Sequence, residues 1–565
     1  MSDPAGDDRL ARDLDAIRSA RQRGPLVTLT TYARMSGPGW LQSAITLGGG
    51  SLASSLYLGV LAGFSMLWLQ PLAMVLGIVM LSAIAYVTLS TGERPFQAIN
   101  RHVNPVLGWG WALASLAANM VWSLPQFALA TSVVQQNLAP GLFGTDGPLG
   151  ELGSKLVIVG LILALTIGVT FAYDRGTRGV QVYERLLKGL VALVVLCFFG
   201  VVVRLSASAD GLDWAAVVAG FWPDLGSLSE PTATFAPFLE AVSAEARAFW
   251  TTRIVAEQRD VMISAAATAV GINMTFLLPY SILKRGWNRE FRGLARVDLA
   301  VGMLVPFLLA TSCVVIAAAS RFHTKPVEGL VAPAATAEAE PAPKLRAEFE
   351  KICDARLAAL DGTAAGASEE ERASLREALP EADRTLAAML VKRDAFDLAK
   401  ALAPFTGDFF ANILFGIGVL GMALSTITLL MLISGFVICE MLGLPSGGRA
   451  HRLGTLAATT GALGPFVWSK AAFYLAVPTS VFGMALLPIA YWTFFLMMNS
   501  QTLLGADMPR GRNRVVWNTL MLIAAGLATG ASLYSIQAKT GTTGMALLGA
   551  FLALAAIVHV RRRGR

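Results

Sequence analysis

The chain has 565 residues, of which 55% are hydrophobic and 15% are charged, with a formal net charge of +7. Soluble domains carry about 25% charged residues, so this composition excludes a soluble globular protein and indicates an integral membrane protein. The basic residues lie in short loops and form no basic and aromatic groove, so we expect no nucleic-acid partner.

Residues 1–36 are predicted to form a cytoplasmic N-terminal segment. Its opening, MSDPAGDDRLARDLDAIRSARQRG, is too charged for a signal peptide and contains no apolar core. We expect a short helix that is solvated or lies at the membrane interface.

Long apolar runs predict an all-α integral membrane protein with about twelve spanning helices, each long enough for a hydrocarbon core of roughly 30 Å. They form a first transmembrane part, 37–320, with an outer loop at 206–260, and a second part, 405–560, followed by a basic cytoplasmic tail, 561–565. The predicted spans lie near 38–60, 63–89, 107–136, 155–173, 187–205, 261–283, 299–320, 409–439, 453–470, 472–504, 515–536 and 542–560.

Residues 321–404 are predicted to be an extracytoplasmic helical insertion. The segment opens with a low-complexity linker, VAPAATAEAEPAPK, and continues with Ala, Glu and Arg-rich stretches. Ser368 followed by Glu371 forms a capping box, so we expect two short helices that make a hairpin over the outer vestibule. A partner-binding module is the alternative.

Arginines follow the even-numbered spans, whereas the odd-numbered short loops hold single lysines. By the positive-inside rule, this alternation predicts a multi-pass protein of the cell membrane with both termini in the cytoplasm and the lipid bilayer as its partner. The arginines of the even-numbered exits are Arg94, Arg101, Arg175, Arg178, Arg185, Arg285, Arg289, Arg292, Arg296, Arg449, Arg452, Arg510, Arg512 and Arg514.

The first predicted span contains an unusual run of glycines, in the stretch GPGWLQSAITLGGGS at 37–51. Gly48, Gly49 and Gly50 fall near mid-membrane, where an unpaired backbone group costs several kcal/mol unless it lines a cavity or meets a partner. A break there therefore predicts a binding site, although glycine clusters in spans are also close-packing surfaces.

The sixth predicted span contains a second helix breaker. Pro279, in GINMTFLLPYSILK, lacks a backbone donor and disfavours helix at Leu278, so we expect the break there. Broken spans five apart are typical of two inverted five-helix repeats whose first helices are both discontinuous. A simple proline kink is the alternative.

Four stretches resemble the natural-resistance-associated macrophage protein (Nramp) family of divalent-metal transporters. The resemblance implies the LeuT-like inverted-repeat fold, with cargo held between the breaks of helices 1 and 6. The stretches are GPGWLQSA (37–44), VQVYERLLKGLVALVVLCFFG (180–200), LAPFTGDFFANILFGIGVLGMALSTITLLMLISGFVICEML (402–442) and MALLPIAYWTFFLMMNSQTLLG (484–505).

The sequence departs from this family at its metal ligands. Where the family has Asp-Pro-Gly-Asn in helix 1, this chain has Gly48 to Ser51, and where it has Met-Pro-His in helix 6, this chain has Leu278, Pro279 and Tyr280. The predicted membrane cores contain no ionisable side chain, whereas such residues usually mark ion pathways. Manganese and iron sites favour carboxylate, imidazole or thioether donors, so the metal ligands are unknown and altered selectivity is expected.

The remaining polar groups predict a neutral pocket of hydroxyl, amide and backbone groups. A glycine turn before a half-helix presents free N–H groups and a positive dipole end to the cargo. The expected lining residues are Thr46, Gly48, Gly49, Gly50, Ser51, Gln126, Asn273, Thr275, Leu278, Pro279, Tyr280, Ser425 and Thr428.

These observations predict a secondary transporter that works by alternating access, with no cofactor and no enzymatic activity. A partly hydrated Mg²⁺ is one expected cargo. A small neutral or zwitterionic organic solute fits the pocket equally well. A membrane scaffold or sensor that has lost transport is the third alternative, and protein partners are unknown.

Overall fold

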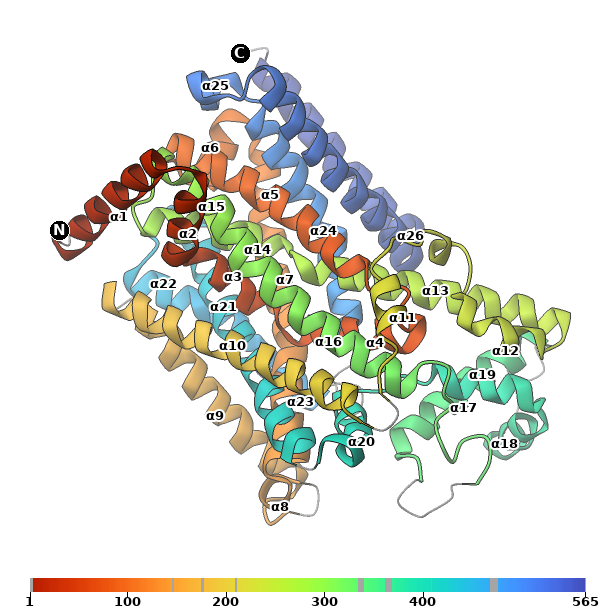
Figure 1. Cartoon of the computed structure of the whole chain (residues 1–565). Coiled ribbons are helices and arrows are strands. Elements are labelled where there is room, and N and C mark those ends of the chain that lie inside the picture. Colours follow the sequence, from red (N-terminus) through yellow and green to blue (C-terminus); the bar gives the residue numbers. More distant parts are fainter. Residues whose placement is uncertain are drawn as a thin grey trace.

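The computed structural model consists of helices joined by turns, and no strand occurs among the residues that it describes (Figure 1). This architecture confirms the prediction of an all-α membrane protein. Apolar helices suit a hydrocarbon core because they satisfy their own backbone hydrogen bonds. The described residues are 4–144, 147–173, 177–208, 211–333, 340–360, 368–407, 409–467 and 476–563.

The first span is divided into two half-helices, α3 (Pro38–Thr46) and α4 (Gly49–Ala62), which are bent by 54°. The other helices that precede residue 207 are continuous. They are α1 (Pro4–Arg23), α2 (Pro25–Met35), α5 (Leu69–Thr91), α6 (Pro95–His102), α7 (Pro105–Val133) with its π-helical end η1 (Val134–Leu138), α8 (Pro140–Phe143), α9 (Gly150–Tyr173) and α10 (Thr177–Ser206).

The sixth span is divided as well, into α13 (Ala244–Ala269) and α14 (Ile272–Lys284). Helix α13 begins inside the predicted outer loop and continues without interruption into the membrane part. The neighbouring elements are α11 (Trp214–Ala219), η2 (Gly226–Leu228), η3 (Ala233–Phe235), α12 (Ala236–Glu240), η4 (Arg289–Phe291), α15 (Arg292–Leu299), η5 (Ala300–Leu304) and α16 (Val305–Phe322).

The segment predicted as an insertion holds four helices where two were expected. The capping box is confirmed, because Ser368 Oγ accepts a hydrogen bond from the Glu371 backbone N–H at 3.3 Å. Leu379 caps the end of α18 and Pro380, the next residue, cannot continue that helix, so a separate helix begins at Glu381. The four helices are α17 (Pro343–Leu360), α18 (Glu369–Ala378), α19 (Glu381–Leu390) and α20 (Ala395–Thr406).

The last part of the chain is built around α21 (Phe415–Met441), which packs against α3, α7, α10 and α22. The predicted ninth span is described only to Val467, and residues 468–470 of it lie outside the described part. The remaining elements are η8 (Phe409–Leu414), α22 (Gly448–Thr455), η9 (Leu456–Leu463), α23 (Gly464–Val467), α24 (Ala476–Met498), α25 (Gln501–Leu504), η10 (Gly505–Asp507) and α26 (Gly511–Arg563).

Helix α26 contains a reversal at Gly541, whose backbone is non-helical (φ 60°, ψ −145°). Lys539, just before it, pairs with Asp260 at 2.5 Å, whereas Arg562 near the chain end donates to the carbonyl of Asn100 at 2.9 Å. The element therefore comprises two helical arms, which correspond to the last two predicted spans.

Nine helices in the described part of the chain are long and apolar enough to span a membrane, and the bent pair α3 and α4 makes a tenth. This count differs from the predicted twelve spans at two places. Helix α26 is counted once although it comprises two arms, and the ninth predicted span is described only to Val467.

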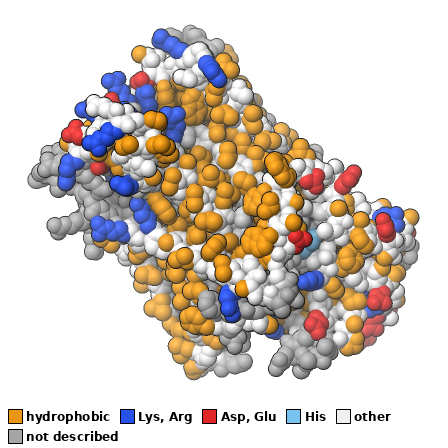
Figure 2. All heavy atoms as spheres, viewed as in Figure 1, with side chains coloured by type: hydrophobic (Ala, Val, Ile, Leu, Met, Phe, Trp, Pro, Cys, Tyr) orange, Lys and Arg blue, Asp and Glu red, His pale blue; other side chains and the backbone are white. Residues whose placement is uncertain are grey.

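The exits of the second, sixth, eighth and tenth predicted spans lie at one end of the molecule. Arg94 pairs with Glu440 at 2.9 Å, and Arg292 pairs with Asp507 at 3.0 Å, so loops far apart in sequence meet there. In Figure 2, Lys and Arg side chains gather at the end that carries α1, α2 and α15, beside a broad hydrophobic surface. Both chain ends lie toward this basic end, opposite α17, α18 and α19.

Candidate functional site

The break in the first span lies at Leu47 and Gly48, at the start of the run of three glycines where a break was predicted. Leu47 has φ −81° and ψ 59°, and Gly48 is extended, with φ −108° and ψ −179°. Gly49 and Gly50 already belong to α4, so the expectation of a non-helical turn at these two residues is wrong. The glycines are instead required by close neighbours, because a Cβ on Gly49 would lie 2.7 Å from Leu129 Cδ2.

The backbone N–H of Gly49 does not remain free for a cargo. It donates a 3.0 Å hydrogen bond to Oε1 of Gln126, which projects from α7. Across the same break, the hydroxyl of Ser51 donates to the carbonyl of Thr46, which the end of α3 leaves without a helical partner. The structure thus brings four predicted residues together, but as partners of one another.

The break in the sixth span lies at Val270 and Gly271, and its predicted position at Leu278 and Pro279 is wrong. Val270 has φ −144° and ψ 109°, and Gly271 has φ −85° and ψ 162°. Pro279 lies inside α14, where one lost hydrogen bond is tolerated in a spanning helix. Gly271 is placed at the break because any Cβ would collide with the Trp122 ring.

The two breaks meet directly. The hydroxyl of Thr46 donates to the carbonyl of Ala269 at 3.3 Å, which joins the end of α3 to the end of α13. Met274 lies in the same place, because its sulfur accepts from Thr46 Oγ1 at 3.5 Å and from the Gly271 N–H at 3.4 Å. Met274 was not among the site residues predicted from the sequence. Its position three residues after Gly271 could have indicated it, had the break been expected there.

Three of the predicted α14 residues lie away from this meeting point. Leu278 and Pro279 follow the break by two helical turns, and Leu278 is fully buried. Tyr280 stacks between Phe276 and Phe436, with ring centroids 4.7 Å and 5.6 Å apart. These contacts make this stretch part of a packed aromatic core.

The remaining predicted residues hold neighbouring helices together. Thr275 accepts a 2.9 Å hydrogen bond from the Trp111 indole. Ser425 of α21 donates to the carbonyl of Ala44 in α3 at 3.0 Å, whereas Thr428 donates to the carbonyl of Ser425 within its own helix at 2.8 Å. Ser425 therefore borders the site, and Thr428 lies one turn further along α21.

Two buried amide side chains near the breaks each have one polar atom without a hydrogen-bond partner within the described part of the chain. These atoms are Oε1 of Gln42, one turn before the break in α3, and Nδ2 of Asn273, just after Gly271. Both side chains are fully buried. Buried polar atoms without partners are uncommon, so this acceptor and this donor are available to a cargo.

At the basic end of the molecule, α3 is fixed by the buried carboxylate of Asp298. Asp298 accepts hydrogen bonds from the backbone N–H groups of Gly37 and Gly39, each at 2.7 Å, and from the hydroxyl of Ser36. A carboxylate at a helix N-terminus satisfies unpaired donors and favours the helix dipole. The half-helix α3 is thereby held against the start of the seventh span.

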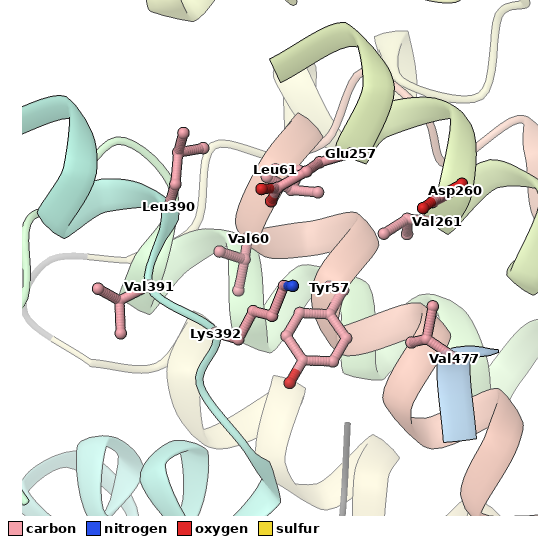
Figure 3. A pocket seen from close by; sticks show the side chains of 10 residues that line it. All are labelled: Tyr57, Val60, Leu61, Glu257, Asp260, Val261, Leu390, Val391, Lys392 and Val477. Atoms are coloured by element: carbon pink, nitrogen blue, oxygen red, sulfur yellow. The ribbon is translucent and has the colours of Figure 1, made fainter. Parts of the chain in front are cut away.

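On the opposite side, α4 and α13 pack directly against each other. The hydroxyls of Ser54 and Ser264 lie 2.6 Å apart and form a hydrogen bond between the two half-helices. One helical turn from these two serines lies a small cavity of about 20 Å³, lined by Tyr57 and Glu257 among others (Figure 3). Such a volume suits about one water molecule.

The charged residues around this cavity are paired. Glu257 pairs with Arg253 at 3.1 Å, and Asp260 pairs with Lys539 at 2.5 Å. Lys392, from the chain that follows α19, extends toward the same space (Figure 3). The segment predicted as an insertion therefore contributes a residue to the cavity between α4 and α13.

The donor set at the breaks is neutral. Among the residues that the structure describes, no group of three or more His, Cys, Asp or Glu side chains is placed to hold a metal ion. The available donors are carbonyl and amide oxygens, hydroxyls and one thioether. Such a set can solvate a polar solute or a cation that keeps part of its water shell.

A helical protein with two broken spans that meet in its interior is a membrane transporter of the LeuT-like inverted-repeat class. The family model described as "Natural resistance-associated macrophage protein-like" matches residues 39–340 and 384–538. The chain therefore belongs to the Nramp family, whose members are transporters and not enzymes. The gap between the two matched stretches, 341–383, contains α17 and α18.

Solved structures agree with this fold. A crystal structure of a mutant manganese transporter from Eremococcus coleocola is 14% identical, with a TM-score of 0.61, and covers 94% of this chain and 95% of that one. The same transporter in complex with an aromatic bis-isothiourea substituted compound is also 14% identical, with a TM-score of 0.60 and 95% coverage of each chain. No curated protein sequence matches this chain.

Proposed function

We propose that this protein transports a divalent metal cation by alternating access around the breaks of α3/α4 and α13/α14. The observation that supports this proposal is the hydrogen bond from Thr46 to the carbonyl of Ala269, which places the two breaks side by side in a buried position. In inverted-repeat transporters, cargo binds where discontinuous helices of the two repeats meet.

The selectivity is altered from that of a typical transition-metal transporter. A bare dication that faces only neutral donors is poorly compensated, so a cation that keeps several waters is favoured, with Mg²⁺ as the leading cargo. The thioether of Met274 is the one soft donor at the breaks and favours transition metals. We infer that one thioether does not replace the missing carboxylates, and that Mn²⁺ and Fe²⁺ bind weakly.

A second candidate is the transport of a small neutral or zwitterionic solute. It is supported by the unpartnered acceptor of Gln42 and the unpartnered donor of Asn273, which suit hydrogen bonds to a polar organic molecule. A scaffold or sensor without transport is the third reading of the same fold.

Uptake by the reconstituted full chain separates these possibilities. Proteoliposomes would be given Mg²⁺, labelled Mn²⁺, and a panel of amino acids and other organic solutes, with protein-free vesicles as the background. We expect Mg²⁺ uptake to exceed Mn²⁺ uptake. Uptake of Mn²⁺ alone would overturn the proposed selectivity, uptake of an organic solute alone would favour the second candidate, and no uptake of any cargo would favour the scaffold.

A matched pair of variants ties the uptake to the breaks. Asn273→Ala removes the unpartnered Nδ2 donor, whereas Glu370→Gln changes an exposed residue of α18 far from the site. We expect only the first variant to lower uptake per folded molecule.

A further inference from the structure

A groove of about 590 Å³ opens between α5, the start of the seventh span and the first arm of α26. Its lining includes none of the residues at the two helix breaks. Its deeper walls are apolar and include Val75, Val79, Leu304, Val516 and Leu520. Val75, Val516 and Leu520 are 46%, 48% and 41% exposed, so this surface faces the surrounding lipid.

The mouth of the groove is polar and aromatic. Tyr86, Arg296, Asn513 and Trp517 line it at the end of the molecule where Tyr86 donates to the carbonyl of Asp507 at 2.8 Å. Tyrosine and tryptophan are typical of the level at which lipid headgroups meet the hydrocarbon. The groove therefore changes from apolar to polar along the direction of the membrane normal.

The dimensions of the groove fit one leaflet. Tyr86 at the mouth and Val75 in the depth are separated by eleven residues of α5, or about 16 Å of helix. Half of a hydrocarbon core of roughly 30 Å is about 15 Å. The apolar part can accordingly accommodate an acyl chain that starts at the headgroup level.

The charge at the mouth favours an anionic headgroup. Arg292 is neutralised by Asp507 at 3.0 Å and lies over the Tyr86 ring at 4.5 Å. Arg296, one turn further along α15, is exposed and has no ion pair or hydrogen bond to another described residue. One guanidinium at the mouth therefore carries an uncompensated positive charge.

We propose that this groove binds a phospholipid with an anionic headgroup. The phosphate is held at the mouth by Arg296 and Asn513, and an acyl chain lies between α5, η5 and α26. Basic pockets between spanning helices are where acidic lipids bind on the cytoplasmic face, which is also the face that the arginine pattern assigns to this end.

A lipid bound in this groove lies next to the segment that holds half-helix α3. Arg296 and Asp298 lie two residues apart on α15, and Asp298 caps the N-terminus of half-helix α3. A lipid that steadies α15 also steadies the segment that holds α3. This consequence rests on the proposed function, whereas lipid binding itself does not.

The test compares two lipids that share dioleoyl chains, phosphatidylglycerol and phosphatidylcholine, on the delipidated full chain in a neutral detergent. Bound lipid is counted by native mass spectrometry, and thermal unfolding gives an independent readout. We expect phosphatidylglycerol to bind more tightly. Because a basic residue contributes about 1 kcal/mol to acidic-lipid binding, Arg296→Gln should weaken phosphatidylglycerol binding about fivefold.

Two further variants show whether the lipid occupies this groove. Val516→Trp fills the apolar wall without changing the charge and should reduce retention of both lipids. Arg512→Gln removes an exposed arginine that does not line the groove and should change binding less than twofold. If Val516→Trp does not fold, the comparison of the two arginine variants still decides.

Three outcomes would overturn the proposal. They are equal binding of the two lipids, equal losses in Arg296→Gln and Arg512→Gln, and displacement of phosphatidylglycerol by soluble glycerol phosphate at the same concentration. The second would indicate diffuse attraction to a basic surface, and the third a site for free phosphate.

Discussion

The backbone N–H of Gly49 donates a 3.0 Å hydrogen bond to Oε1 of Gln126, so α7 supplies the acceptor for the first turn of α4. This contact satisfies one of the donors that a helix N-terminus leaves unpaired. It also requires that no side chain stand at residue 49, since a Cβ there would lie 2.9 Å from the same oxygen.

The glycines of the break should therefore differ in sensitivity. Gly49→Ala must displace Leu129 and Gln126, and overpacking of this kind costs about 1–3 kcal/mol. Gly50→Ala meets only Thr268 Cγ2 at 3.1 Å and Ser480 Oγ at 3.3 Å. We expect Gly49→Ala to lower the initial uptake rate per folded molecule about tenfold and Gly50→Ala by less than threefold. Equal rates in both variants and wild type would refute the placement of the site.

The purified protein should bind Mn²⁺, Fe²⁺ and Cd²⁺ weakly, with dissociation constants well above the micromolar range. The reason is the neutral donor set at the breaks, which lacks the anionic ligands that these ions favour. Isothermal calorimetry checks this expectation, and micromolar Mn²⁺ binding would contradict it.

The thioether of Met274 should account for whatever transition-metal binding remains. Met274→Leu keeps the volume and removes the soft donor, so the ratio of Mn²⁺ to Mg²⁺ uptake should fall severalfold. Leu278→Met is the matched control, because it adds a thioether two turns beyond the break, and it should leave the ratio unchanged. A larger effect of the control would move the site toward the predicted position at 278–280.

The insertion should show a pH-dependent stability that originates at Asp397. Burial and the neighbouring Asp394 carboxylate raise the pKa of Asp397 to about 6, against the opposing effect of Lys344, whose Nζ lies 3.2 Å away. Because the pKa of Asp397 is raised in the folded state, the stabilisation that this residue contributes is complete below its unfolded pKa of about 4. It is lost as the pH rises through about 6.

As the pH rises from 4.5 to 7.5, the free energy of unfolding of Asp397→Asn should therefore increase relative to that of wild type by roughly 1–3 kcal/mol. The amide still accepts the 2.7 Å hydrogen bond from the Asp394 N–H, so the helix cap is retained. Thermal unfolding at the two pH values measures the difference, with Glu370→Gln as an exposed control. An unchanged pH dependence in Asp397→Asn would show that another group is responsible.

The arginine pattern predicts that the basic end faces the cytoplasm. Cysteines introduced at Glu340 and Arg565 should differ in labelling by a membrane-impermeant reagent in intact cells, with the first accessible and the second protected. The background is low because the four native cysteines are buried. The reverse pattern would invert the assigned orientation.

The sequence by itself determined the class of protein and the position of the first break. Apolar length and the arginine alternation follow from the thickness and electrostatics of a bilayer, which act on each segment locally. The glycine run at 48–50 marked the first break within one residue because glycines are needed wherever helices approach closely.

Only the tertiary structure decided where the sixth span breaks and which groups face the cargo. Pro279 is the stronger local breaker, yet the chain breaks at Gly271, where the Trp122 ring from α7 leaves no space for a side chain. In the same way, Gln126 satisfies Gly49, and Met274 replaces the expected Leu278 at the breaks. These outcomes depend on contacts between residues far apart in the chain, and local propensity carries no information about such contacts.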